Sequence, residues 1–406
     1  MINVLSIVFD SIQKTQYVYR DTRVANLIKV GNPIYILPEC LHVHLIIIIF
    51  IQMKIKSLKA YKKNLALQKP YVIARETITD VENVFFEITL DNGIKGIGAA
   101  NPAPEVVGET PAQTFQNLQS GFIEYLIGKD IREFLHHIYI CREHFKNLPG
   151  TQACIDIALH DAFGQFIGIP IVNFYGRHHE KILTSVTIGI KEMKETIEEA
   201  NDYYAKGFRV LKVKTGLDAE SDAERIIKLK EKFGNHFTIR VDANTGYDLS
   251  QLQLFLEKTK HAGIELIEQP LATAIDSELI KLPVGTRSIL AADESLKNAQ
   301  SALKLAQQNL YGIFNIKLMK CGGINGAFEI ASIAKPANID LFWGCNDESI
   351  VSITAALHAA FACPHTKYLD LDGSLDLAED AVSGGFVIED GYMYPNDKPG
   401  LGLTIL

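Results

Sequence analysis

The alternation of apolar and polar residues predicts strands first and helices next. From residue 53 to about residue 100, runs such as "NVFFEITLDNGIKGIGAA" alternate with the period of a β-strand, and residues 91–93 (Asp-Asn-Gly) are typical of a hairpin turn. From residue 110 to 169 the period becomes helical, opening on a Thr-Pro pair and closing on glycine. These patterns predict an α+β module in this part of the chain.

From residue 183 onward, strand-like runs alternate with amphipathic helical stretches. Such alternation implies parallel pairing, and eight strand-like runs indicate a closed (β/α)₈ barrel. An open doubly wound sheet is the alternative, but no G-x-G-x-x-G follows a strand. The eight runs are "LTSVTIGI", "RVLKVKTG", "HFTIRVDAN", "IELIEQP", "SILAADES", "YGIFNIKLMKCGG", "IDLFWGCN" and "KYLDLDG".

These patterns divide the chain into four parts. We predict an extension at residues 1–52, an α+β capping domain at 53–170, the barrel at 171–373, and a hairpin-like segment at 374–406 that returns to the capping domain. The apolar run "LHVHLIIIIFI" in the extension is too short to span a bilayer and lacks the basic start and cleavage site of a signal peptide. We interpret the extension as sequence without a chemical role, translated from a start upstream of Met53.

Composition narrows the class of partner. The formal net charge is −8, and no basic run is present to neutralise phosphates, so we expect no nucleic-acid or stable membrane partner. The six cysteines include no C-x-x-C pair and indicate reduced thiols in the cytoplasm. We therefore expect a cytoplasmic homo-oligomer that acts on a small molecule.

Charged residues gather at the carboxyl ends of the predicted strands, where barrel enzymes carry their active sites. Lys212 and Lys214 stand two apart and share one face of a strand. Lysines are also common on solvent-exposed edge strands, where they prevent aggregation, so the pair alone does not indicate an active site. The other strand ends carry Asp242, Glu268, Asp293, Lys317, Asp370 and Asp372.

Three of these acids fall on consecutive strands, one βα unit apart. Asp242, Glu268 and Asp293 would then converge on one side of the barrel mouth. Oxygen donors without histidine or cysteine suit Mg²⁺ better than Zn²⁺. Helix capping and a structural ion network are the alternatives for these acids.

The lysines of opposite strands predict the reaction. Lys214 and Lys317 would lie across the mouth from each other, as the two bases of an epimerisation require. Lys212, with Mg²⁺, would stabilise the enediolate formed between the two proton transfers and favour the neutral amine of Lys214. Asp370 and Asp372 would hold a substrate ammonium several bonds away, which fits a dipeptide.

The motifs K-x-K, "DAN", "EQP", "DES", "NIKLMKCGG" and "LDLDG", in this order, resemble the enolase superfamily and, within its muconate-lactonizing subgroup, the dipeptide epimerases related to L-Ala-D/L-Glu epimerase. The resemblance runs from Met53 to the end. It implies that the three acids bind Mg²⁺, that Lys214 and Lys317 are the two bases, that Lys212 contacts the substrate carboxylate, and that Asp370 and Asp372 bind the dipeptide N-terminus.

Two loops bear on the substrate side chain. Family members that act on Ala-Glu place an arginine after P-F-x-I-A-R, whereas "PYVIARETITD" has Glu76 and Ile78 there and only Arg75 nearby. A buried glutamate side chain would lack a partner, so we expect small or apolar C-terminal residues, as in Ala-Ala or Ala-Val. The run "GCNDESI" departs from the family pattern by placing Asn346 and Asp347 in the pocket wall, and Asp347 would favour a cationic substrate.

Several other functions stay open at this point. Within the superfamily they are L-Ala-D/L-Glu epimerase, cycloisomerase and o-succinylbenzoate synthase. A Schiff-base aldolase would use Lys214 or Lys317 as a nucleophile and would need no triad of acids. A non-catalytic metal-binding protein would need neither lysine.

Overall fold

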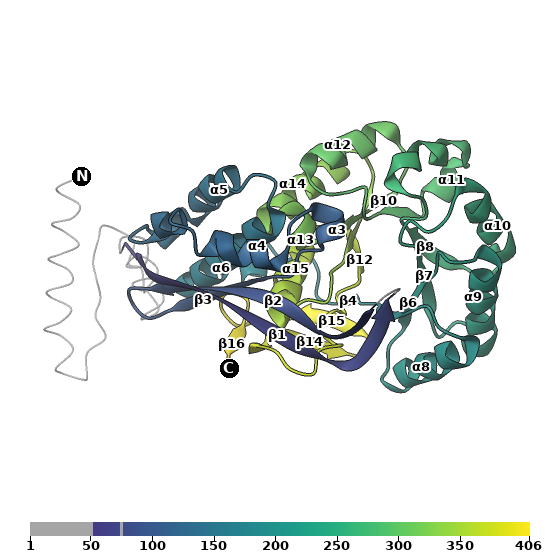
Figure 1. Ribbon diagram of the computed structural model, residues 1–406, viewed down its shortest axis with the longest axis horizontal. Helices are drawn as coiled ribbons and strands as arrows, with labels where there is room; N and C mark the ends of the chain where they lie inside the picture. Colours follow the sequence, from purple (N-terminus) through teal and green to yellow (C-terminus); the bar gives the residue numbers. More distant parts are fainter. Residues whose placement is uncertain (1–51, 74–75) are drawn as a thin grey trace, which may run out of the picture. The chain divides into compact units, whose positions relative to one another are not determined.

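The computed structural model describes residues 52–406, except for residues 74–75 and the side chains of residues 69–78. Figure 1 shows how the helices and strands of these residues are arranged. Almost all of the predicted extension, including its apolar run, lies outside the described residues, as does Cys40.

The capping domain is built on an antiparallel sheet of three strands, in the order β1 (Ile55–Ile73), β2 (Glu76–Leu90) and β3 (Lys95–Ala100). The predicted hairpin turn is confirmed: Gly93 has a φ of 87° and its N–H donates to the Leu90 carbonyl at 2.9 Å. The helices are α3 (Pro104–Val107), α4 (Pro111–Leu118), η1 (Ile123–Leu126), η2 (Ile131–Glu133), α5 (Phe134–His144), α6 (Pro149–Ile167) and α7 (Ile171–Tyr175).

Helix α6 packs directly on strand β3, and glycine makes this approach possible. A Cβ built at Gly98 would lie 1.9 Å from the carbonyl oxygen of Cys154 on α6. The helix ends at Gly168, whose φ of 76° lies in the left-handed region. The predicted glycine stop of this helix is therefore confirmed.

The predicted (β/α)₈ barrel is also confirmed. Its eight strands follow one another in chain order, and a parallel bridge links Leu369, at the end of the last strand, to Thr184, two residues before the first. The strands are β5 (Val186–Ile188), β6 (Val210–Lys214), β7 (Thr238–Asp242), β8 (Ile264–Glu268), β9 (Leu290–Ala292), β10 (Ile313–Ile316), β11 (Asp340–Trp343) and β12 (Thr366–Leu369).

Helices surround these strands, with three departures from a regular repeat (Figure 1). A 3₁₀ helix and a four-residue α-helix follow β8, two α-helices follow β10, and no helix follows β12 before the C-terminal segment. The barrel helices are α8 (Met193–Ala205), α9 (Ala219–Phe233), α10 (Leu249–Thr259), η3 (Thr273–Lys281), α11 (Val284–Arg287), α12 (Ala299–Gln308), α13 (Leu318–Cys321), α14 (Ile324–Ala334) and α15 (Ile350–Ala362).

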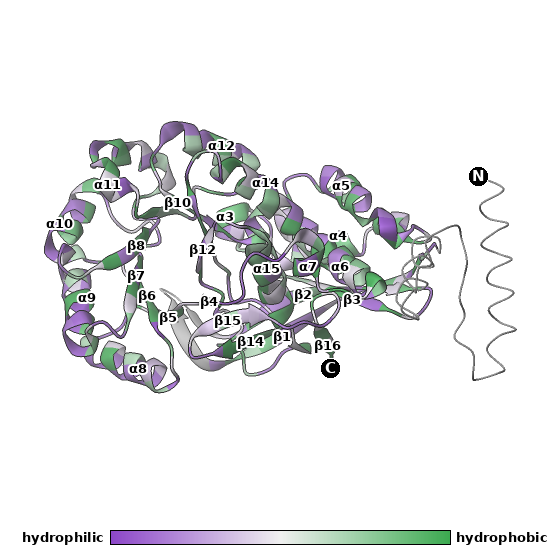
Figure 2. Ribbon diagram, turned by 180° about the vertical axis from the view of Figure 1, so that it is seen from behind, coloured by the Kyte–Doolittle hydropathy of each residue, from purple (hydrophilic) through white to green (hydrophobic). Residues whose placement is uncertain are grey.

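Side chains fill the inside of the barrel below the strand ends. The strands are mostly hydrophobic in Figure 2, as expected for a sheet covered on both faces. One small core cluster comprises Leu266, Ala291, Ile313, Phe342 and Tyr368. The buried guanidinium of Arg240 lies over the rings of the last two residues and donates to Glu265 at 2.7 Å. This packed floor leaves the carboxyl ends of the strands as the place for a site.

The C-terminal segment contains β13 (Val382–Gly384), β14 (Phe386–Glu389), β15 (Tyr392–Pro395) and β16 (Leu403–Ile405). As predicted, β14 and β15 form a hairpin, which extends through β15 to strand β4 (Ile182–Leu183) ahead of the barrel. Elsewhere the segment contacts the capping domain: the Ala378 N–H donates to Ala66 at 2.7 Å, and the Leu401 N–H donates to Asp161 at 2.8 Å. The domain boundaries stay a prediction.

Two further features concern the described residues as a whole. No helix within residues 52–406 is long and apolar enough to cross a membrane. The cysteines of this part of the chain are unpaired, and they are Cys141, Cys154, Cys321, Cys345 and Cys363.

Candidate active site

The register of the parallel strands brings the predicted acids together. Lys214 pairs with Asp242 across β6 and β7, and Asp242 pairs with Glu268 across β7 and β8. Asp293 follows directly on β9, the next strand of the sheet. All three carboxylates are buried. Their charge is therefore concentrated at one side of the barrel mouth.

Lys212 is the centre of a buried charge network. Its Nζ lies 2.7 Å from Asp370 Oδ2, 2.9 Å from Glu268 Oε2 and 3.0 Å from Asp242 Oδ2. Burial alone would lower the pKa of Lys212, but the charges of these carboxylates raise it well above its usual value. These carboxylates therefore favour the ammonium form of Lys212.

Lys214 and Lys317 stand at the two ends of the row of acids. Lys214 Nζ donates to Asp242 Oδ2 and to Asn244 Oδ1, both at 2.8 Å. Lys317 directly follows β10, four strands away from β6, and its Nζ lies 2.9 Å from Asp293 Oδ2. Burial favours the neutral amine of Lys317, but the charges of Asp293 and Glu268 outweigh it and raise the pKa of Lys317 above its usual value. While Lys317 is paired with Asp293, its pKa is therefore not lowered as a catalytic base would require.

The chemistry of the three acids fits a divalent cation. Within the described residues, no three His, Cys, Asp or Glu side chains are gathered closely enough to hold a metal ion, and the carboxylates of the site are paired with lysines. Even so, burial together with the charges of Asp242 and Asp293 raises the pKa of Glu268 to about 8. Glu268 Oε2 is buried, and within the described part of the chain its partner is the Lys212 ammonium at 2.9 Å. Buried carboxylate oxygens on three adjacent strands are the donors that Mg²⁺ prefers.

The structure gives Asp370 and Asp372 different partners. Asp370 accepts from Ser185 Oγ at 2.6 Å as well as from Lys212, and the charge of Lys212 outweighs burial and lowers its pKa. Asp372 accepts from the Thr187 backbone N–H at 2.7 Å. Burial and the charges of Asp370 and Asp376 raise the pKa of Asp372 to about 7. Asp372 is thus the member of the pair whose charge is less well compensated.

The loop after β11 is anchored to the capping domain. Asn346 Nδ2 donates to the Asn101 carbonyl at 3.1 Å, and Asn101 Nδ2 donates to the Asp347 carbonyl at 2.8 Å. Loss of hydration and the charges of Asp347 and Glu199 raise the pKa of Asp376 to about 6. Several acids therefore gather on this side of the mouth, with Lys191 and Lys206 compensating them in part.

The other predicted specificity residues lie outside the described residues. Arg75 is one of them, and the side chain of Ile78 is another.

Three polar residues at the site were not singled out from the sequence. Asn315 Nδ2 donates to Glu268 Oε1 at 2.8 Å, and Lys320 Nζ pairs with Asp293 and donates to the Asn315 carbonyl at 3.1 Å. Asp376 is the third. Strand alternation places Asn315 on the same face as Lys317 two residues later, and this signal was available in the sequence. Lys320 lies in the short helix α13 and Asp376 in a turn after β12, where the alternation of a strand does not apply.

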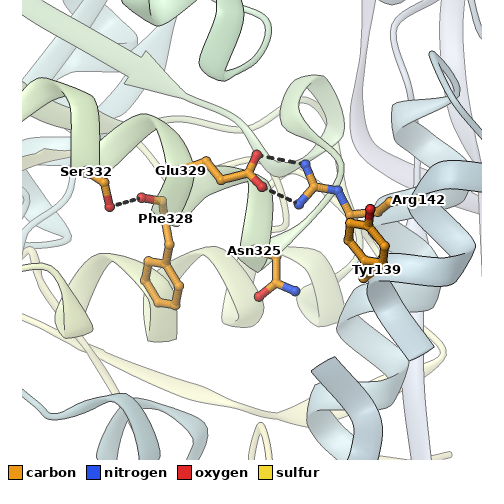
Figure 3. Close-up of a pocket in the computed structure, with 6 residues that line it drawn as sticks. All are labelled: Tyr139, Arg142, Asn325, Phe328, Glu329 and Ser332. Carbon is orange, nitrogen blue, oxygen red and sulfur yellow. Dashed lines mark hydrogen bonds and ion pairs between the residues drawn. The ribbon is translucent and has the colours of Figure 1, made fainter. Parts of the chain in front are cut away.

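A surface hollow of about 320 Å³ lies apart from the strand ends, between α5 and α14 (Figure 3). Arg142 and Glu329 form a paired guanidinium–carboxylate contact there, at 3.0 and 2.8 Å. Because both charged groups are already engaged with each other, this hollow is a weaker candidate for a ligand site than the barrel mouth.

Comparisons with known proteins agree with this geometry. Residues 55–176 match the N-terminal domain of the mandelate racemase / muconate lactonizing enzyme family, and residues 195–406 match the enolase C-terminal domain-like model. An L-Lys-D/L-Arg epimerase of Desulforapulum autotrophicum is 49% identical over 352 residues, which cover 86% of this chain and 99% of that protein. An L-Lys-D/L-Arg epimerase of Methylococcus capsulatus is 46% identical over 356 residues, covering 87% and 99%.

A solved structure is also similar to this chain in both sequence and fold. The dipeptide epimerase of Methylococcus capsulatus, complexed with Mg and the dipeptide L-Arg-D-Lys, superposes with a TM-score of 0.84 at 45% identity, covering 86% of this chain and 99% of that one. Both domain models and these full-length matches show that the chain belongs to the enolase superfamily, in its mandelate racemase and muconate lactonizing enzyme branch.

Proposed function

We propose that this protein is a Mg²⁺-dependent epimerase that inverts the α-carbon of the C-terminal residue of a dipeptide. The enzyme class follows from the family, since the matched relatives are epimerases and the chain is therefore an isomerase. The observation that carries the mechanism is the placement of Lys214 and Lys317 on strands four apart, each bonded to a different carboxylate of the acid row.

Asp242, Glu268 and Asp293 would hold the Mg²⁺ ion. When bound, the ion polarises the substrate carboxylate and supports the negative charge that develops as the α-proton leaves. Asn315 keeps one oxygen of Glu268 in place through its 2.8 Å hydrogen bond. The protein therefore fixes the orientation of the Glu268 carboxylate as well as supplying its charge.

Lys214 and Lys317 move the proton. One amine removes the α-proton from one side of the carbon, and the ammonium of the other delivers a proton from the opposite side. The two lysines exchange roles in the reverse direction. Lys212, held protonated by its carboxylate partners, supplies a fixed positive charge beside the substrate carboxylate.

We also propose a dipeptide with cationic side chains as the substrate, in place of the small or apolar residues expected from the sequence. That expectation rested on a loop whose side chains lie outside the described residues. The acids at the mouth support the new proposal. Burial, together with repulsion from neighbouring carboxylates, raises the pKa of Asp372 to about 7 and of Asp376 to about 6, and a bound cation would offset that repulsion. The relatives that match at 49% and 46% identity are L-Lys-D/L-Arg epimerases.

Asp372 is the better candidate of its pair for the substrate ammonium. Asp370 is paired directly with Lys212 at 2.7 Å, whereas Asp372 accepts from a backbone N–H, and the charges of Asp370 and Asp376 outweigh the effect of Lys212 on it. The cationic side chains of the substrate would then lie toward Asp376, whose pKa is raised to about 6 by burial and by the charges of Asp347 and Glu199.

NMR in D₂O with Mg²⁺ tests these proposals. L-Lys-L-Arg and L-Ala-L-Ala are compared by following loss of the C-terminal α-proton signal and the appearance of the epimer. We expect exchange with inversion for L-Lys-L-Arg in the intact enzyme, loss of inversion in Lys317→Ala, and no change in Lys335→Ala, a matched control on an exposed lysine. No exchange on either dipeptide would contradict the activity, whereas preference for L-Ala-L-Ala would contradict the substrate class alone.

The proposal also covers the cellular location and the oligomeric state of the protein. The unpaired cysteines of the described chain support a cytoplasmic location. The homo-oligomeric state stays a prediction.

A further inference from the structure

Gln269 lies between two of the proposed metal ligands, and the mechanism above gives it no task. It follows Glu268 at the end of β8, and its side chain is fully buried. Its φ of 33° lies in the left-handed region, which a residue with a long side chain seldom adopts. A strained and fully buried amide at this position needs a physical reason.

The side-chain carbonyl of Gln269 joins the end of β8 to the turn after β9. Oε1 accepts from the Asp293 N–H at 3.0 Å and from the Ser295 N–H at 3.2 Å. The Gln269 backbone N–H donates to the Ala291 carbonyl at 2.9 Å. The backbone that carries Asp293 is therefore held from both sides by a single residue.

The backbone of Gln269 also reaches the third ligand-bearing loop. The Thr245 N–H, in the turn that follows Asp242, donates to the Gln269 carbonyl at 2.8 Å. The strand ends that carry Asp242, Glu268 and Asp293 thus meet at Gln269.

The amide nitrogen of Gln269 fixes the orientation of the side chain. Nε2 lies 2.9 Å from Ser295 Oγ, 2.9 Å from Tyr311 Oη and 3.0 Å from the Leu271 carbonyl. Tyr311 donates in turn to Asp276 at 2.7 Å, and Ser295 also donates to Asp276. These acceptors require the NH₂ group on this side, so the carbonyl must face Asp293.

We propose that Gln269 is a positioning residue that fixes the relative placement of the Asp242, Glu268 and Asp293 carboxylates and thereby sets the affinity for the divalent cation. The inference rests on the proposed metal site. Gln269 itself touches neither metal nor substrate and acts through the backbone of the ligands. Partners that orient metal ligands typically contribute 10–100-fold to metal affinity or activity.

Mn²⁺ binding to the full chain, measured by titration with electron paramagnetic resonance detection of the free ion, tests this role apart from turnover. Gln269→Met keeps the volume but removes the amide. Gln269→Asn keeps an amide and tolerates positive φ, but it is one methylene too short to reach Asp293. Tyr311→Phe is the matched control, since it removes a hydroxyl from the same network while leaving the contact to Asp293.

We expect the Mn²⁺ dissociation constant to rise about 10- to 100-fold in Gln269→Met and Gln269→Asn and to change less than about twofold in Tyr311→Phe, although all three lower the melting temperature. If Gln269→Met does not fold, Gln269→Asn decides. Wild-type affinity in the folded Gln269 variants would overturn the positioning role. Absence of Mn²⁺ binding in the wild type would instead overturn the metal site on which the proposed function depends.

Discussion

His358 makes the stability of the barrel sensitive to acid. It lies on α15, fully buried, and its Nδ1 accepts from the Val172 N–H at 3.0 Å. Burial, with a smaller contribution from the charge of Arg177, lowers its pKa from 6.5 to about 3. Between these two values the unfolded chain binds a proton that the folded chain excludes. The contribution of this histidine is therefore complete above pH 6.5 and is lost as the pH falls below it.

The size of the effect follows from the shift. Each pH unit between the two pKa values corresponds to about 1.4 kcal/mol, so lowering the pH from 6.5 to 5 lowers the free energy of unfolding by about 2 kcal/mol through His358 alone. His358→Asn keeps an acceptor near the position of Nδ1 and cannot be protonated. Between pH 7.5 and pH 5 the wild type should lose about 2 kcal/mol more than this variant.

Urea unfolding at the two pH values measures this difference. Trp343 is the single tryptophan of the chain and is buried on β11, so its fluorescence reports unfolding of the barrel. His261→Asn, at an exposed histidine, is the control and should behave as the wild type does. An equal loss of stability in His358→Asn and the wild type would refute the reasoning.

Three further predictions concern the charge network around Lys212, the loop after β11 and the capping domain. Lys212→Met leaves buried carboxylates without their cation and should lower the free energy of unfolding by about 3–5 kcal/mol in urea titrations; an unchanged midpoint would contradict the pairing. Asn101→Ala removes the bond to the Asp347 carbonyl and should lower the preference in kcat/KM for L-Lys-L-Arg over L-Ala-L-Ala by about 5-fold, as expected for about 1 kcal/mol; an unaltered ratio would show that the anchor is dispensable. Gly98→Ala should destabilise the protein by about 1–3 kcal/mol through its clash with α6, while Gly121→Ala, which meets nothing within 4 Å, should be nearly neutral in the same thermal assay.

Local periodicity explains why so much of the barrel was predictable. The alternation of side chains along a strand places Lys212 and Lys214 on one face, and the parallel register then aligns Lys214, Asp242 and Glu268 without further assumption. The Asp-Asn-Gly hairpin turn and the glycine end of α6 are equally local, because each depends on a backbone conformation that few residues adopt. Family resemblance added the chemistry to these positions.

Pairing between distant residues decided the rest. The sequence by itself placed Asp370 and Asp372 on one face, but the structure bonds Asp370 to Lys212, 158 residues away, and leaves Asp372 among other acids. The hold of Asn101 on the loop of Asp347 spans 246 residues and joins two domains. Periodicity describes neighbours along the chain, whereas the compensation of a buried charge depends on what the folded chain packs against it. The sequence therefore determined which groups reach the mouth of the barrel, and only the tertiary structure decided which of those charges remain for a substrate.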